Sequence, residues 1–165
     1  MSETRWLDPV EMRAWRNFVD LTGEIMASLD EDLREHNITL GDYEVLVFLS
    51  EAPEQRMRMC DLAARLRLTP SGLTRRLDGL VSAGFVARHV DQTDRRVTNA
   101  VLTPAGFDHL VSTAPHHVES VRRQILTFMT PSQIDHFGSA LESIKLGRED
   151  ARATRDDARA NLVEH

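Results

Sequence analysis

Two short helical segments followed by two β-branched runs constrain the fold of this chain most strongly. The segments "RMRMCDLAARLRL" and "TPSGLTRRLDGLVSAG" are amphipathic and are joined by a tight turn. Thr69 and Pro70 form a typical start for the second helix, and Gly84 forms a typical end. The runs at 85–90 and 97–102 flank the polar "DQTDRR" and predict a β-hairpin. Helix, turn, helix and hairpin in this order predict a winged helix.

Helices are also predicted on both sides of this region. Asp8 stands before a proline as a helix cap, and apolar residues recur at helical spacing from there to about His36. A helix this long needs a larger partner surface than one small chain supplies, which favours a dimer. Thr-Pro pairs at 103–104 and 130–131 start two further helices, and Pro115 is expected to kink or interrupt the first of them.

The charge of the chain is unevenly distributed. The formal net charge is −6, whereas residues 55–96 hold nine arginines and four aspartates, a net charge of +5. The remainder therefore carries −11. A basic centre between acidic arms indicates a surface for a polyanion on a scaffold that resists non-specific adhesion. Chance clustering of solvated charges is the alternative.

The second helix of the turn motif has an outward face suited to a DNA major groove. On a helical wheel its leucines share one arc, whereas Ser71, Arg75 and Asp78 point the opposite way, flanked by Thr74 and Arg76. Small residues permit close approach, and the helix N-terminus favours a phosphate. Arg75 is the leading candidate for a base contact, because a bidentate arginine–guanine pair discriminates by about 1–3 kcal/mol. A solvated helix face is the alternative for both arginines.

The tip of the predicted hairpin carries Asp94, Arg95 and Arg96. A hairpin beside a groove-inserted helix reaches the neighbouring minor groove, where narrow A·T-rich segments attract arginine. Asp94 would orient one arginine through a carboxylate–guanidinium pair, and the sequence leaves open which one. A weak exposed ion pair is the alternative, but it would not account for the second arginine.

The run "LTPSGLTRRLDGLVSAGFVARHVDQTDRRVTNAVLTPAG" (68–106) resembles the helix-turn-helix and wing of the MarR (multiple-antibiotic-resistance regulator) family. The shared marks are the recognition helix, the "GFV" entry to the first wing strand, the "DRR" tip, and the "T-x-x-G" start of the next helix. The flanking helices extend the resemblance over most of residues 9–147. It implies a homodimer in which two winged helices read a pseudo-palindromic DNA operator.

The resemblance also implies which residues meet DNA and where an effector binds. The DNA contacts that it implies are Ser71, Thr74, Arg75, Arg76, Asp94, Arg95 and Arg96. Family members often bind an aromatic or phenolic acid between the dimerisation helices and the DNA-binding lobe. Residues on elements that would line such a pocket are Trp15, Arg16, Phe18, Tyr43 and Phe48. A role in the dimer core is the alternative for these aromatic residues.

We therefore expect a mainly α-helical fold with a small β-hairpin wing, a winged helix-turn-helix between N- and C-terminal dimerisation helices. The expected parts are a dimerisation helix (1–40), the DNA-binding region (41–103), C-terminal dimerisation helices (104–150) and a charged tail, either a frayed helix or disordered (151–165). The expected function is transcriptional regulation of double-stranded DNA, as a repressor that a small aromatic or phenolic acid releases. No apolar run is long enough to span a bilayer and no signal pattern begins the chain, so we expect it in the cytoplasm.

A metal- or redox-responsive regulator of the same shape is the second hypothesis. His109, His116, His117 and His136 cluster in the C-terminal half, but they lack a compact metal-ligand spacing. Cys60 is the single cysteine, and a small buried or capping role is expected for it. Because catalytic motifs are absent too, we expect no enzyme, metal or cofactor. A helical dimerisation module that never touches DNA is the remaining alternative.

Overall fold

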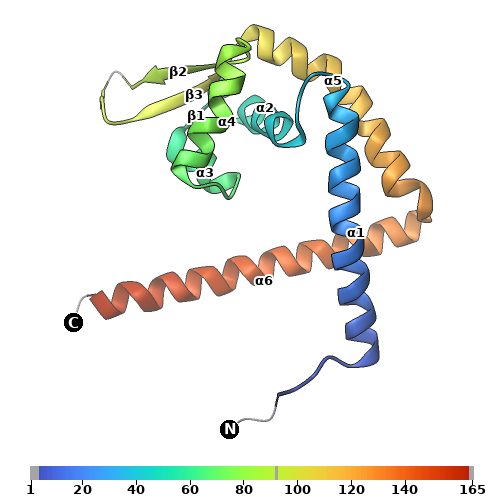
Figure 1. Cartoon of the computed structure of the whole chain (residues 1–165). Coiled ribbons are helices and arrows are strands. Elements are labelled where there is room, and N and C mark those ends of the chain that lie inside the picture. The colour runs from blue at the N-terminus through green and yellow to red at the C-terminus, as the bar shows by residue number, and fades with distance from the viewer. Residues whose placement is uncertain (1–3, 92, 164–165) are drawn as a thin grey trace. The chain divides into compact units, whose positions relative to one another are not determined.

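The computed structural model describes residues 4–91 and 93–163, with side chains up to residue 155 (Figure 1). The chain divides into two compact units, Met1–Gln124 and Ile125–His165. None of the described helices combines the length and the apolarity that crossing a bilayer requires. The outermost residues of the predicted N-terminal and tail segments, 1–3 and 164–165, lie outside the described residues.

Helix α1 (Pro9–Arg34) begins where the sequence predicts. The Asp8 carboxylate accepts two backbone N–H hydrogen bonds at 2.7 and 2.9 Å, and the Glu11 carboxylate accepts one from the backbone of Asp8 at 2.9 Å. This capping box satisfies donors that the start of a helix otherwise leaves without partners. Leu29 and Leu33, near the end of α1, are its buried residues. Among the described residues, the earlier turns of α1 contain no fully buried side chain.

The core of the first unit forms where α2 (Leu40–Glu51), α3 (Met59–Arg65) and α4 (Pro70–Ser82) meet. The side chains buried to 1% exposure or less in these helices are Val45, Leu46, Leu49, Leu62, Leu73 and Leu77. Burial of each such side chain contributes about 1.5–3 kcal/mol. The turn between α3 and α4 contains Arg67 at a positive φ of 55°. The predicted helix-turn-helix is therefore present.

The wing is a three-stranded antiparallel sheet rather than a hairpin alone. Strands β2 (Val86–Val90) and β3 (Thr98–Leu102) pair with Arg88 opposite Ala100, which confirms the predicted hairpin. Strand β1 (Arg56–Arg58) pairs with the other side of β3, so the order is β1-β3-β2. The prediction wrongly placed Arg56–Arg58 at the start of the following helix, because three residues are too few to show the alternation by which strands are recognised.

Helix α5 (Pro104–Gln124) is joined to the wing by the "T-x-x-G" segment. The Thr103 hydroxyl lies 2.7 Å from the carbonyl oxygen of Gly84 and 3.0 Å from that of Phe85, and it accepts the Gly106 N–H at 3.0 Å. A Cβ atom added at Gly106 would collide with the Phe85 carbonyl oxygen. Glycine is therefore required there by close approach of the backbone, and α5 starts at a fixed place on the wing.

The two C-terminal helices begin at Pro104 and Pro131, as the Thr-Pro pairs predict. Pro115 does not interrupt α5, which is one helix of 21 residues. The second unit contains a 3-10 turn (Leu126–Phe128) and helix α6 (Pro131–Val163). Of the two alternatives for the charged tail, the structure has the helical one as far as Val163.

Candidate DNA-binding surface

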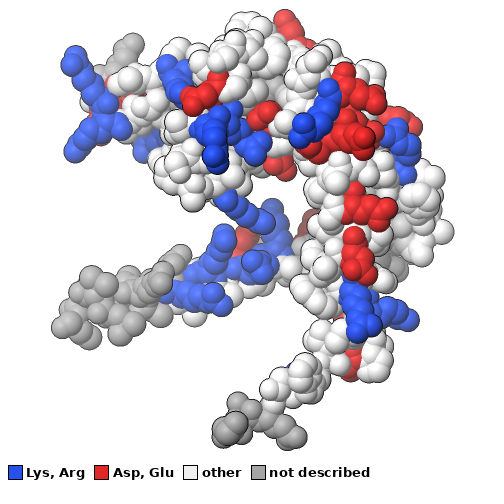
Figure 2. All heavy atoms as spheres, viewed as in Figure 1, with Lys and Arg blue, Asp and Glu red and all other residues white. Residues whose placement is uncertain are grey.

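Helix α4 is placed with one face buried and the opposite face exposed. The Thr69 hydroxyl accepts the Gly72 N–H at 3.1 Å and caps the helix, while Gly84, at a φ of 77°, follows its end. The leucines of α4 point into the core, which leaves Ser71, Thr74 and Arg75 exposed as predicted from the helical wheel. Figure 2 shows basic side chains, which are arginines here, over this region and at the free end of the hairpin, and acidic side chains along α1.

Arg76 is held by its own chain. Its guanidinium group lies 3.3 Å from the carboxylate of Asp42, and about two thirds of each side chain is covered. It also lies against Gly41, where an added Cβ atom would collide with it. Asp42 in turn accepts a hydrogen bond of 2.6 Å from the Thr39 hydroxyl at the start of α2. Arg76 therefore ties α4 to α2, and it is less available to DNA than Arg75.

The wing tip distinguishes its two arginines. The Asp94 carboxylate accepts hydrogen bonds from the backbone N–H of Arg96 at 3.0 Å and from its guanidinium Nε at 3.2 Å. The Arg96 side chain is nevertheless 92% exposed. Arg95 is exposed as well, and within the described residues it makes no ion pair. The arginine oriented by Asp94 is thus Arg96, a choice that the sequence left open.

Asp91 sets the shape of the turn before this tip. Its carboxylate accepts hydrogen bonds from the backbone N–H groups of Thr93 and Asp94 at 2.9 and 3.2 Å. Hydrogen bonds from the side chain and backbone of Thr93, then from the backbone of Asp94, lower the pKa of Asp91 to about 2. The carboxylate is therefore ionised at every pH at which the protein is expected to work.

The residues predicted for the effector pocket do not gather in one place. Trp15 and Phe18 stack with ring centroids 6.2 Å apart on the exposed part of α1, beside the exposed Arg16. Tyr43 is buried and its ring lies 4.6 Å from that of His117. The ring of Phe48 is covered by the guanidinium group of Arg65 at 4.3 Å. Tyr43 and Phe48 therefore have partners within the chain, whereas the α1 pair faces outward.

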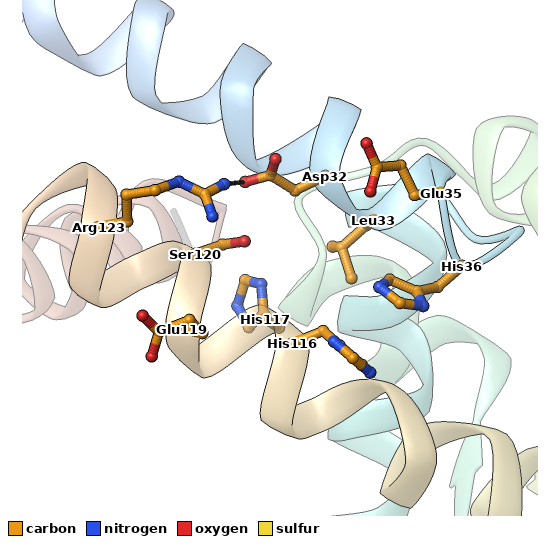
Figure 3. A pocket seen from close by; sticks show the side chains of 9 residues that line it. All are labelled: Asp32, Leu33, Glu35, His36, His116, His117, Glu119, Ser120 and Arg123. Carbon is orange, nitrogen blue, oxygen red and sulfur yellow. Dashed lines mark hydrogen bonds and ion pairs between the residues drawn. The ribbon is translucent and has the colours of Figure 1, made fainter.

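A hollow of about 130 Å³ lies between the end of α1 and helix α5 (Figure 3). Its lining residues are Asp32, Leu33, Glu35, His36, His116, His117, Glu119, Ser120 and Arg123. Asp32 and Arg123 form an ion pair of 2.6 Å across it, and the rings of His36 and His116 stack at 4.1 Å. Burial lowers the pKa of His117, against the opposing effect of Glu44. This volume suits a few water molecules better than an aromatic acid.

His109, His116, His117 and Cys60 have local partners within the chain. His109 stacks on Phe85 at 4.4 Å. Cys60 is exposed, not buried, and its thiol lies 3.4 Å from the Asp61 carboxylate. Across residues 4–91 and 93–155, no three His, Cys, Asp or Glu side chains are arranged to hold a metal ion.

Sequence reasoning missed Arg88 on β2, which entered only into the charge count. Its guanidinium group contacts both the backbone and a carboxylate of α4. The pairing of β2 with β3 and the packing of β2 beside α4 create this contact, so no pattern among neighbouring residues in the sequence predicts it. A basic residue one strand length before the wing tip is the only signal that the sequence offers.

Comparison with known proteins agrees with this geometry. The model of the MarR family matches residues 36–97, from the end of α1 to the wing tip. AbsC, a MarR family transcriptional regulator from Streptomyces coelicolor, superimposes with a TM-score of 0.81 at 36% identity, over 88% of this chain and 99% of that one. Sco3205, a MarR family transcriptional regulator from the same organism, was solved in complex with DNA. It superimposes with a TM-score of 0.81 at 32% identity, over 89% of this chain and 92% of that one.

A third relative has lower sequence identity to this chain. The HTH-type transcriptional repressor YetL of Bacillus subtilis is 24% identical over 115 residues, which are 70% of this chain and 69% of that protein. These relatives are transcriptional regulators rather than enzymes. On the similarity to AbsC, which extends over almost the whole of that protein, this chain belongs to the MarR family and is a DNA-binding transcriptional regulator of that type.

Proposed function

We propose that this chain is a repressor that binds a pseudo-palindromic operator as a homodimer and is released by a small aromatic or phenolic acid. The observation that carries the proposal is the pair of exposed arginines, Arg75 on the capped helix α4 and Arg95 at the wing tip. Neither makes an ion pair within the described residues. Groups so placed contribute little to the fold and are available to DNA in the cytoplasm.

The DNA contacts divide between the two grooves. Helix α4 enters the major groove with Ser71, Thr74 and Arg75 on its leading face, and Arg75 reads a guanine. The Thr74 hydroxyl already donates to the carbonyl oxygen of Pro70 at 2.9 Å, so it is available to DNA as an acceptor and not as a donor. The wing enters the minor groove with Arg95.

Two residues of the predicted DNA-contact set are not expected to contact a base. Arg96, held by Asp94, is directed to the phosphate backbone. Arg76, paired with Asp42, holds the angle of α4 against α2. Phosphate contacts fix the register of a protein on DNA, and base contacts supply its sequence preference.

A second copy of the chain accounts for the apolar side chains that one copy leaves exposed. On α1 these are Val10, Trp15, Phe18, Val19, Leu21 and Met26, each 48% exposed or more. On α6 they are Ile134, Phe137, Leu141 and Ile144, which recur every three or four residues on one helix face. Monomeric proteins rarely expose a large apolar patch, and each of these two helices presents a row of apolar side chains. A dimer also places two α4 helices at the separation that DNA requires, about 34–36 Å.

The effector acts by changing that separation. In the proposed dimer the stacked pair of Trp15 and Phe18 lines the effector site at the border of the α1 interface, and Arg16 supplies a positive charge for a ring carboxylate. Tyr43 and Phe48 are already packed against His117 and Arg65, so the proposed effector site depends on the α1 residues. A ligand that favours the released conformation by a few kcal/mol empties the operator.

Titration of the full chain against the DNA upstream of its own gene tests DNA binding. Affinity should fall steeply with salt, because each phosphate contact adds about 0.9 to the slope of log affinity against log salt. Arg75→Ala should relax the preference at one base position, whereas the matched variant Arg13→Ala on α1 should bind as the wild type does. Sequence-blind binding in the micromolar range, insensitive to salt, would overturn the proposal.

A transcriptional reporter tests repression and release. Expression should rise when the regulator is deleted and when 2-hydroxybenzoate or 4-hydroxybenzoate is added. Loss of the response in Trp15→Ala, with DNA binding kept, supports the α1 site. Release by a chelator or an oxidant, and not by either acid, would favour a metal- or redox-responsive regulator instead.

A further inference from the structure

The Arg88 side chain on strand β2 contacts helix α4 at two points. Its Nη2 donates a hydrogen bond of 2.9 Å to the backbone carbonyl oxygen of Thr74, and its Nη1 lies 2.8 Å from the carboxylate of Asp78. These two positions are one helical turn apart and bracket Arg75. The Arg88 side chain is 30% exposed, although Asp78 is 61% exposed.

The guanidinium group suits this double contact. Its planar fork presents several donors in a fixed geometry, so one side chain serves a carbonyl and a carboxylate together. The Nε atom of Arg88 is buried and has no hydrogen-bond partner in the described part of the chain. A freely solvated arginine would not bury this donor, so the side chain is held in place by packing between β2 and α4.

Two arginines, Arg76 and Arg88, each form an ion pair that links α4 to another element. Arg76 reaches from α4 to Asp42 on α2 at 3.3 Å, and Arg88 reaches from the wing to α4 on another side. The wing and the body of the domain are therefore each tied to the recognition helix by a charged pair. A change in either pair alters the direction in which Arg75 is presented.

The pair also changes the charge that α4 presents. Asp78 lies on the outward arc of the helix with Ser71 and Arg75. A carboxylate on a DNA-facing surface repels phosphates, and this one is neutralised by Arg88 at 2.8 Å. Removal of Arg88 would therefore leave a negative charge beside the base-reading arginine.

We propose that Arg88 is a positioning residue for sequence recognition: it locks the wing to α4 and masks Asp78, and so sets base preference without touching a base. The inference rests on the proposed function, since it assumes that α4 reads DNA. It predicts that Arg88 and Asp78 act as one unit, whereas an arginine that simply contacts a phosphate would act independently of Asp78.

A double-mutant cycle on the full chain tests this proposal with the DNA upstream of its own gene. The variants are Arg88→Met, Asp78→Asn, the two combined, and Arg88→Lys, with Arg13→Met on α1 as the matched control. We expect Arg88→Met to weaken binding about tenfold in the wild-type background and at most about threefold in the Asp78→Asn background, as for coupled neighbours. The DNA affinity of Arg88→Lys should lie between those of the wild type and Arg88→Met, because an ammonium group lacks the planar, two-pronged geometry of a guanidinium group.

Two further readouts separate positioning from direct contact. In Arg88→Met the ratio of affinities for this DNA and for a shuffled duplex should fall, although Arg75 is intact. The slope of log affinity against log salt should be the same in the combined variant as in Asp78→Asn alone. If Arg88 contacted a phosphate in each subunit, its loss would lower the magnitude of this slope by about 1.8. Circular dichroism and thermal unfolding check that each variant is folded. If Arg88→Met does not fold, Arg88→Lys replaces it in the double-mutant cycle.

Equal losses in both backgrounds, together with a lower salt slope, would overturn the positioning role and make Arg88 a phosphate contact. The proposed function fails on a different result, namely wild-type binding that is flat with salt and blind to sequence. The two failures are therefore distinguishable in one set of titrations.

Discussion

Replacement of Gly106 by alanine should destabilise the protein even though glycine lies within a helix. Alanine in a helix interior is favoured over glycine by up to about 1 kcal/mol, so the steric cost of the new methyl group must exceed this gain in helix stability. At this position the new Cβ would collide with the backbone carbonyl oxygen of Phe85, and it would come within 3.0 Å of a Leu102 methyl group. A backbone atom does not yield as a flexible side chain does, and such overpacking costs about 1–3 kcal/mol.

The same collision threatens the hydrogen bonds from Thr103 to the carbonyl oxygens of Gly84 and Phe85. The net loss should therefore be about 1–3 kcal/mol, with a fall in Tm of about 2–4 °C per kcal/mol for a chain of this size. Urea and thermal unfolding followed by circular dichroism measure both quantities. The matched control is Gly79→Ala in α4, where an added Cβ meets nothing within 4 Å and stability should rise. An equal rise in Gly106→Ala would refute the steric reasoning.

Three further predictions concern stability, acid sensitivity and assembly. Arg76→Ala removes the pair with Asp42, which is only partly exposed, and should lower the free energy of unfolding by about 1 kcal/mol; no loss in urea titration would mean that α2 does not support α4. Burial lowers the pKa of His109 and of His117, so the unfolded chain binds protons more readily than the folded one. Stability should therefore be full above about pH 6.5 and should decline as pH falls below it, less steeply in His117→Gln; a rise on acidification would contradict this. Phe18→Glu puts a charge on the exposed apolar face of α1 and should yield monomers by light scattering, whereas Arg13→Ala should remain dimeric; an unchanged dimer would remove α1 from the interface.

The sequence predicted best those elements whose signals are local. The start of α4 at Thr69 and Pro70, its end at Gly84 and the two long wing strands each depend on residues within a few positions of one another. The outward face of α4 followed from its 3.6-residue period alone, since the leucines that had to be buried leave Ser71 and Arg75 opposite them.

Contacts between distant residues could not be predicted in this way. Arg76 meets Asp42 across 34 positions and Arg88 meets Asp78 across two different elements, so neither pair has a local signature. Strand β1 is three residues long and exists because β3 offers it an edge. The exposure of Cys60, expected to be buried or capping, likewise depends on how α3 packs and not on its neighbours in sequence.

The effector site was the least predictable part. Aromatic residues on the expected elements were correctly placed on α1 and α2, but whether two rings share one cavity depends on the packing of the elements, which sequence spacing does not encode. Trp15 and Phe18 do meet, because they are three residues apart on one helix. The hollow beside α5 is lined by histidines and carboxylates that the sequence offered only as scattered residues.

Hydroxyl-radical footprinting of the full chain on the DNA upstream of its own gene tests most directly that α4 and the wing read DNA together. The wild type should protect two regions centred about 10–10.5 base pairs apart, each flanked by a protected minor groove. Arg95→Ala should lose the flanking minor-groove protection and keep the central pair, while Arg13→Ala should match the wild type. Uniform cleavage along the duplex, or flanking protection unchanged by Arg95→Ala, would contradict the account.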